Sequence, residues 1–196
     1  MIAADDNSQV MKRIFDMVLA FAALVVLAVP MLAVALAVKL TSRGPVLYWS
    51  NRVGRGNVIF KMPKFRTMGT DAPAVATHLL ADPDRFITPV GKFLRRSSLD
   101  ELPQLFSILK GDMSFVGPRP ALFNQDDLIA LRTAKGVQCI TPGLTGWAQV
   151  NGRDDLPIPV KVNFDEYYLI NRGIALDLKI LVVTAFQALA GKGVKH

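Results

Sequence analysis

Apolar residues form one long unbroken run near the N-terminus and only short, interrupted runs in the rest of the chain. Met17 to Val38 are twenty-two consecutive residues without a charge. At about 1.5 Å per residue, a helix of this length can cross a hydrocarbon core of about 30 Å. Pro30 lies inside the run and removes one of its backbone hydrogen bonds. The pattern therefore predicts a membrane helix with a break near Pro30.

The charges that flank this run do not decide whether the helix spans the membrane or re-enters it from one side. Lys12 and Arg13 precede it, and Lys39 and Arg43 follow it. Because basic flanks prefer the cytoplasmic side, both ends are expected there, and a helix-break-helix that enters one leaflet and returns would satisfy this. A single spanning helix fits the hydropathy equally well. A cleaved signal peptide fits less well, because the run is longer than the usual apolar core of such peptides.

Downstream, the pattern predicts a mixture of short strands and helices. Residues 46–49 and 58–60 read as strands around a turn at Gly54 and Gly56, and residues 70–90 read as a surface excursion. A helix is expected from about Pro103 to Lys110, another is expected to open at Asp165, and residues 180–190 are too short to span a membrane and predict a core or interfacial helix. We therefore expect an α+β protein with a membrane segment at residues 1–42 and a mainly helical catalytic domain, carrying short β-strands, at residues 43–196.

The formal net charge of +7 calls for a partner of opposite sign, either nucleic acid, anionic lipid or a phosphorylated substrate. Nine basic residues between positions 12 and 66 lie near the apolar run, which favours lipid headgroups, and no nucleic-acid-binding module accompanies them. Cys139, the only cysteine, is expected to be a small buried residue rather than a catalytic thiol. With only His78 and His196 in the chain, a histidine base or a zinc cluster is disfavoured.

The most informative polar residues are the adjacent acids Asp100 and Glu101, just before the helix expected from Pro103. Free backbone N–H groups and the positive end of the helix dipole favour ionised carboxylates and phosphate at such a position. The alternative is an ordinary helix cap formed by Ser98 or Asp100. Further along, Pro118 and Pro120 hold the backbone on both sides of Arg119, which suits either phosphate binding or a simple turn. Acids among arginines at a membrane suit phosphoryl transfer to a lipid, with a divalent ion held by carboxylate oxygens.

Five segments, taken together, resemble the bacterial sugar transferase family, the monotopic phosphoglycosyl transferases. In chain order they are residues 12–16 (KRIFD), 64–68 (KFRTM), 98–104 (SLDELPQ), 110–120 (KGDMSFVGPRP) and 143–153 (GLTGWAQVNGR). These segments follow the order found in the family and are spread across nearly the whole chain. The resemblance implies a small monotopic membrane protein with a re-entrant N-terminal helix, anchored in the bacterial inner membrane, with its catalytic domain on the cytoplasmic face.

The same resemblance implies a reaction. A sugar phosphate, expected to carry an N-acetylated sugar, is transferred from a UDP-sugar to polyprenyl (undecaprenyl) phosphate, as the first membrane step of bacterial glycoconjugate synthesis. Asp100 matches the nucleophile that attacks the β-phosphate, releases UMP and carries the phosphosugar until the lipid phosphate collects it. Glu101 matches the Mg²⁺ ligand. A covalent intermediate of this kind divides one difficult transfer into two easier steps.

The remaining site residues are carried over by position. Lys64, Arg95, Arg119 and Arg153 are expected to contact phosphate or nucleotide, and Asp165 is expected to be a polar site residue. Two positions depart from the family, since Val29 stands where a serine is usual before the membrane proline, and Thr141 stands where an arginine is usual. The rival interpretation is a non-catalytic membrane module whose basic surface binds anionic lipid or nucleic acid, but such a module has no use for the Asp100–Glu101 pair.

Overall fold

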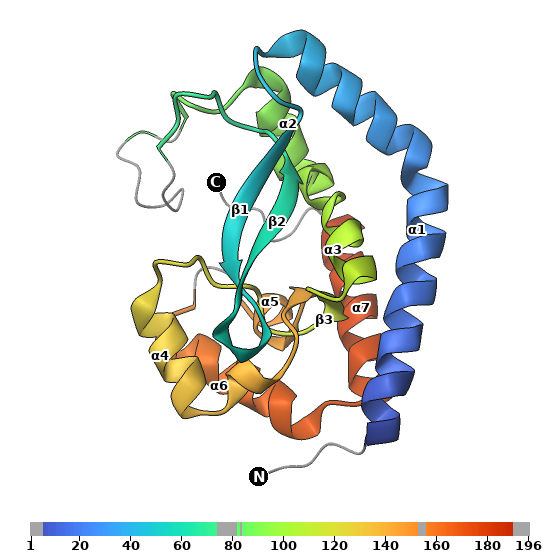
Figure 1. Ribbon diagram of the computed structural model, residues 1–196, viewed down its shortest axis with the longest axis vertical. Helices are drawn as coiled ribbons and strands as arrows, with labels where there is room; N and C mark the ends of the chain where they lie inside the picture. Colours follow the sequence, from blue (N-terminus) through green and yellow to red (C-terminus); the bar gives the residue numbers. More distant parts are fainter. Residues whose placement is uncertain (1–5, 74–81, 83, 153–155, 190–196) are drawn as a thin grey trace.

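The computed structural model describes residues 6–73, 82, 84–152 and 156–189. Its longest element is α1 (Asp6–Thr41), which lies along one side of the molecule and contains Pro30. Figure 1 shows that α1 bends toward its C-terminal end, where it passes over α2 (Pro89–Ser97). α1 is the one helix in the described part of the chain that is long and apolar enough to cross a membrane. The predicted long apolar helix is confirmed, but the predicted break near Pro30 is wrong, since α1 continues through Pro30 as one helix. A re-entrant path stays a prediction.

The hairpin of β1 (Leu47–Val53) and β2 (Ile59–Phe65) occupies the centre of the view in Figure 1. Its antiparallel register runs from Leu47 opposite Phe65 to Val53 opposite Ile59, and the connection contains the 3₁₀ turn η1 (Arg55–Asn57). Both strands are longer than the sequence pattern predicted. The polar residues that follow the predicted strand segments, such as Asn51 and Lys61, also pair across the hairpin. Backbone hydrogen bonding does not depend on side-chain polarity.

The second, smaller sheet is a parallel pair of β3 (Ser114–Val116) and β4 (Gly143–Thr145), neither of which the hydropathy pattern predicted. The two strands approach unusually closely at their glycines. A Cβ atom placed on Gly143 would lie 2.1 Å from the backbone nitrogen of Gly117, so a larger residue there would displace one of the two segments. The absence of a side chain at Gly143 and Gly117 permits this close approach.

The remaining described helices surround the two sheets. They are η3 (Leu99–Glu101), α3 (Gln104–Lys110), α4 (Asp126–Ala134), η4 (Val137–Cys139), α5 (Trp147–Val150), α6 (Ile158–Asn171) and α7 (Ile174–Leu189). The helix at residues 103–110 is confirmed. The helix expected to open at Asp165 begins earlier, at Ile158, because Pro157 and Pro159 fit its first turn and Val162 supplies a buried apolar contact.

α1 contributes to the core of the molecule. Ala20 belongs to the main cluster of buried residues with Phe60 and Ile108, and Val34 and Val38 belong to a second cluster with Leu94. Cys139, expected to be buried, is exposed at the end of η4, where the short 3₁₀ turn directs it outward while Val137 and Ile140 fill the interior.

Candidate active site

The two adjacent acids lie where the chain turns from α2 into α3. Ser98 ends α2 with φ 56° and ψ 16°, a left-handed conformation that is uncommon for residues other than glycine. This single residue allows α2 to end and η3 to begin at once. η3 then carries Asp100 and Glu101, and Pro103 leads directly into α3. The predicted position of the acids beside a helix start is confirmed, but neither Ser98 nor Asp100 provides a side-chain cap to the helix.

Glu101 is held by two cations that come from different parts of the fold. Lys64 Nζ lies 2.7 Å from Glu101 Oε1, and an Arg119 guanidinium nitrogen (NH2) lies 3.1 Å from the same oxygen. Lys64 shares a strand face with the buried Phe60 and Met62, which directs its side chain inward. Arg119 follows β3. The pair of ion contacts therefore joins β2, η3 and the segment after β3.

The two carboxyl groups have opposite acidities. Burial raises the pKa of Asp100 to about 6, with Glu101 adding to the rise and with Lys64, Arg95 and Arg119 opposing it. Burial also acts to raise the pKa of Glu101, but Lys64 and Arg119 together outweigh burial and hold this pKa well below its usual range. In the described part of the chain, Glu101 forms two ion pairs and Asp100 forms none. Such divergence between neighbouring acids is typical of groups with different catalytic roles.

Arg95 reaches the same region from the last turn of α2. Its Nε donates to Thr67 Oγ1 at 3.0 Å, and its guanidinium is close enough to Asp100 for each charge to influence the other. Burial lowers the pKa of Arg95 and Asp100 raises it. Lys64, Arg95 and Arg119 thus lie around the acid pair as the sequence predicted, and Arg153 lies outside the described residues.

Asp165 has a different environment from the acid pair. Its carboxylate is almost fully buried and accepts from Arg132 Nε at 2.9 Å and from the NH2 group of Arg132 at 2.7 Å. Burial raises the pKa of Asp165, and Arg132 opposes the rise. Arg132 was not among the predicted site residues, because it stands thirty-three positions before Asp165, on another helix, and no motif marks it.

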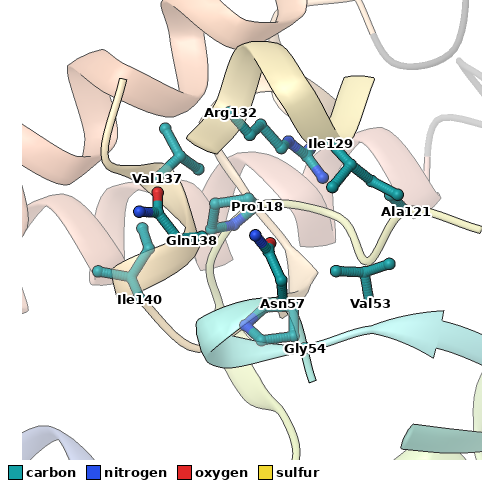
Figure 2. Close-up of a pocket in the computed structure, with 11 residues that line it drawn as sticks. Val53, Gly54, Asn57, Pro118, Ala121, Ile129, Arg132, Val137, Gln138 and Ile140 are labelled. Carbon is teal, nitrogen blue, oxygen red and sulfur yellow. The ribbon is translucent and has the colours of Figure 1, made fainter. Parts of the chain in front are cut away.

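A small cavity of about 30 Å³ lies behind the Arg119 segment. Figure 2 shows Pro118, Asn57, Gln138 and Arg132 around it. This volume has room for one or two water molecules and not for a nucleotide. The buried Gln138 Oε1 has no protein partner, so water is its expected one. The cavity is lined by neither Asp100 nor Glu101, so it is separate from the acid pair.

Comparison with known proteins gives a consistent picture. The model of the bacterial sugar transferase family matches residues 7–191. An uncharacterised sugar transferase of Bacillus subtilis, EpsL, is 39% identical over 95% of this chain and 91% of its own length. A UDP-N-acetylgalactosamine–undecaprenyl-phosphate N-acetylgalactosaminephosphotransferase of Aeromonas hydrophila is 38% identical over 94% of this chain. An undecaprenyl-phosphate galactose phosphotransferase of Salmonella typhimurium is 39% identical over 97% of this chain. The chain spans 45% and 43% of the lengths of these last two relatives.

Proposed function

Since the chain belongs to the bacterial sugar transferase family, we propose that it transfers a sugar phosphate from a UDP-sugar to polyprenyl phosphate and releases UMP. The names of the Aeromonas and Salmonella relatives support a sugar phosphotransferase that acts on undecaprenyl phosphate. We further propose an N-acetylated sugar, as in the name of the Aeromonas relative, although the Salmonella relative is named for galactose.

The observation that carries the proposal is the contrast between the two adjacent carboxyl groups. Glu101 is fixed as an anion by Lys64 and Arg119, whereas Asp100 is buried, forms no ion pair among the described residues and has a pKa raised to about 6. At neutral pH Asp100 is therefore mostly ionised, and its oxygens, unlike Oε1 of Glu101, form no ion pair among the described residues, which makes it the better nucleophile of the two.

In the proposed first step, a carboxylate oxygen of Asp100 attacks the β-phosphorus of the UDP-sugar. A new bond forms between this oxygen and phosphorus, the bond from phosphorus to the bridging oxygen breaks, and UMP leaves with that electron pair. In the second step, an oxygen of polyprenyl phosphate attacks the same phosphorus and displaces the Asp100 carboxylate. Lys64, Arg95 and Arg119 bind the phosphate oxygens and offset their charge in both steps.

The donor set at Glu101 fits a magnesium ion. Both of its ion pairs use Oε1, which leaves Oε2 for a metal. The described residues contain no group of three or more acidic, histidine or cysteine ligands, and Mg²⁺ bound with a nucleotide commonly takes only one or two carboxylates, with phosphate oxygens and water completing its shell. A magnesium ion held by Glu101 would neutralise diphosphate charge and help UMP to leave.

We propose that α1 enters and leaves the inner membrane from the cytoplasmic side. Lys12, near its N-terminal end, lies 2.7 Å from Asp177 of α7, and Arg13 donates to the carbonyl oxygens of Ile108 and Leu109 at the end of α3. The other end of α1 leads directly into β1. Both ends therefore contact the catalytic domain, which supports the re-entrant interpretation over a spanning helix.

The test is a panel of UDP-sugars incubated with the purified protein, Mg²⁺ and undecaprenyl phosphate, with UMP as the readout. We expect one or a few UDP-sugars, N-acetylated ones among them, to release UMP. Asp100→Asn should abolish release. When undecaprenyl phosphate is left out, a UDP-sugar labelled with ³²P at its β-phosphate should leave the label on the wild-type protein but not on this variant. Substantial turnover by Asp100→Asn would exclude the covalent role, and failure of every UDP-sugar would exclude the transferase.

A further inference from the structure

Arg132 makes three hydrogen bonds, and they join three separate parts of the chain. Two bind Asp165 of α6, and the third runs from an Arg132 guanidinium nitrogen (NH1) to the backbone carbonyl oxygen of Arg119 at 2.8 Å. Arg132 is 8% exposed and Asp165 is 1% exposed. Simple attachment of α4 to α6 does not call for a buried ion pair, since apolar residues of similar size would serve as well. The hydrogen bond from Arg132 to the Arg119 carbonyl oxygen explains why a guanidinium, rather than an apolar side chain, occupies this position.

The segment around Arg119 is held by its carbonyl groups. Pro118 and Pro120 have no backbone N–H, so this stretch can donate few hydrogen bonds of its own. Its three consecutive carbonyl oxygens instead accept one bond each, that of Pro118 from the Gly143 backbone at 2.9 Å, that of Arg119 from Arg132 at 2.8 Å and that of Pro120 from Arg52 at 3.1 Å. The bond from Arg132 is the central one of the three.

From this geometry we infer that Arg132 and Asp165 form a positioning pair, which fixes the Arg119 backbone so that the Arg119 side chain meets Glu101. Asp165 orients the Arg132 guanidinium through two bonds and balances its charge, and the remaining nitrogen holds the Arg119 carbonyl. The inference rests on the proposed function only for the statement that Arg119 also meets phosphate. In this arrangement Asp165 orients Arg132 and does not bind the substrate.

A double-mutant cycle tests whether Arg132 acts through Arg119. Arg132→Lys keeps the positive charge but cannot bond Asp165 and the Arg119 carbonyl together, and we expect it to lower kcat/KM for UMP release by about tenfold or more. In an Arg119→Ala background the same substitution should change kcat/KM by less than about twofold. A full loss in both backgrounds would show a merely structural role and would overturn the inference.

Lys135 and Glu166 provide a matched control. They form a partly exposed ion pair between α6 and the residue that ends α4, and none of the bonds given above for the described residues joins either of them to Arg119. Lys135→Ala should leave kcat/KM within about twofold of wild type in either background. A loss equal to that of Arg132→Lys would mean that any weakening of the α4–α6 contact is sufficient, and this too would overturn the inference.

A second measurement needs no turnover. The coupling between Glu101 and Arg119 is obtained from the unfolding midpoints of Glu101→Gln, Arg119→Ala and the double variant, first with Arg132 intact and then with Arg132→Lys. We expect the coupling to fall by at least half when Arg132 is replaced, and an unchanged coupling would refute the inference. Asp165→Asn, nearly identical in shape, replaces Arg132→Lys should the latter fail to fold. Absence of UMP release by the wild type would exclude the proposed function, but the coupling measured from the unfolding midpoints would still test the role of Arg132.

Discussion

Replacing the proposed nucleophile should make the folded protein more stable. Asp100 is buried, and its pKa rises from an ordinary value of 3.8 to about 6 on folding. The folded state thus binds the Asp100 proton more tightly than the unfolded state, so this residue costs stability once it is ionised. At about 1.4 kcal/mol per pH unit, the rise corresponds to about 3 kcal/mol. Asp100→Asn keeps the shape of the neutral acid and removes that cost.

The sign of the pH dependence follows from the same shift. Below about pH 4 Asp100 is protonated in both states, and the variant should match wild type. As the pH rises through the window from about 4 to 6, the wild type loses the stability that depends on its proton, while Asp100→Asn does not titrate. The advantage of the variant should therefore grow across this window and level off above it. At pH 8 we expect a gain of about 1–3 kcal/mol, or roughly 3–10 °C in the unfolding midpoint.

The assay is thermal unfolding of both proteins in the same detergent, with EDTA and without substrate, at half-unit steps from pH 4 to pH 8. Glu101 interacts with Asp100, but its pKa lies so far below this range that it stays ionised in the folded protein throughout the assay. The pH dependence of the difference between the two curves therefore reports on Asp100. Asp126→Asn changes an exposed acid in the first turn of α4 and serves as the control, with an expected change within about 1 kcal/mol at every pH. A gain that is absent at pH 8, or that stays constant with pH, would refute the reasoning.

Three further predictions address the backbone and the membrane. Gly143→Ala places a methyl group against the Gly117 backbone and should lower UMP release at least tenfold, measured beside the unfolding midpoint to detect wider damage. Ser98→Gly should keep or raise the unfolding midpoint, whereas Ser98→Val should lower stability by about 1–2 kcal/mol, because a β-branched residue tolerates the left-handed conformation poorly. Ser8→Cys, in a Cys139→Ser background that costs little because Cys139 is exposed, should resist an impermeant thiol reagent in intact spheroplasts. Labelling from outside would show that α1 spans the membrane.

Local patterns predicted the parts of the fold that depend on local interactions. The uncharged run predicted the long helix, and Pro103 with the following apolar positions predicted α3. β4 was missed because its three residues pair only with β3, some thirty positions earlier, and close approach at glycine carries no signal in hydropathy. The N-terminal part of α2 was assigned to the surface excursion because its prolines suggested a loop, although Pro89 occupies the first turn of that helix.

The site could be predicted where residue type and motif coincide. The acid pair, Lys64, Arg95 and Arg119 were identified from the sequence, and the structure brings them together around η3. Arg132 could not be found in this way, since no local pattern distinguishes an arginine that donates to a distant carbonyl from one on a solvated helix face. That Asp165 is buried and needs a cation is known only from the structure.

The position of α1 also bears on how this protein reaches its folded state. Ala20, Val34 and Val38 complete two core clusters, and Asp16 accepts a hydrogen bond from the backbone of Phe115 in β3. α1 precedes these segments in the chain and is the surface against which they pack. A variant that lacks residues 1–42 would expose both clusters, so deletion of α1 is not expected to give a soluble enzyme. Insertion into the bilayer is instead expected to be an early step of folding, and conditions that extract α1 from lipid should unfold the catalytic domain with it.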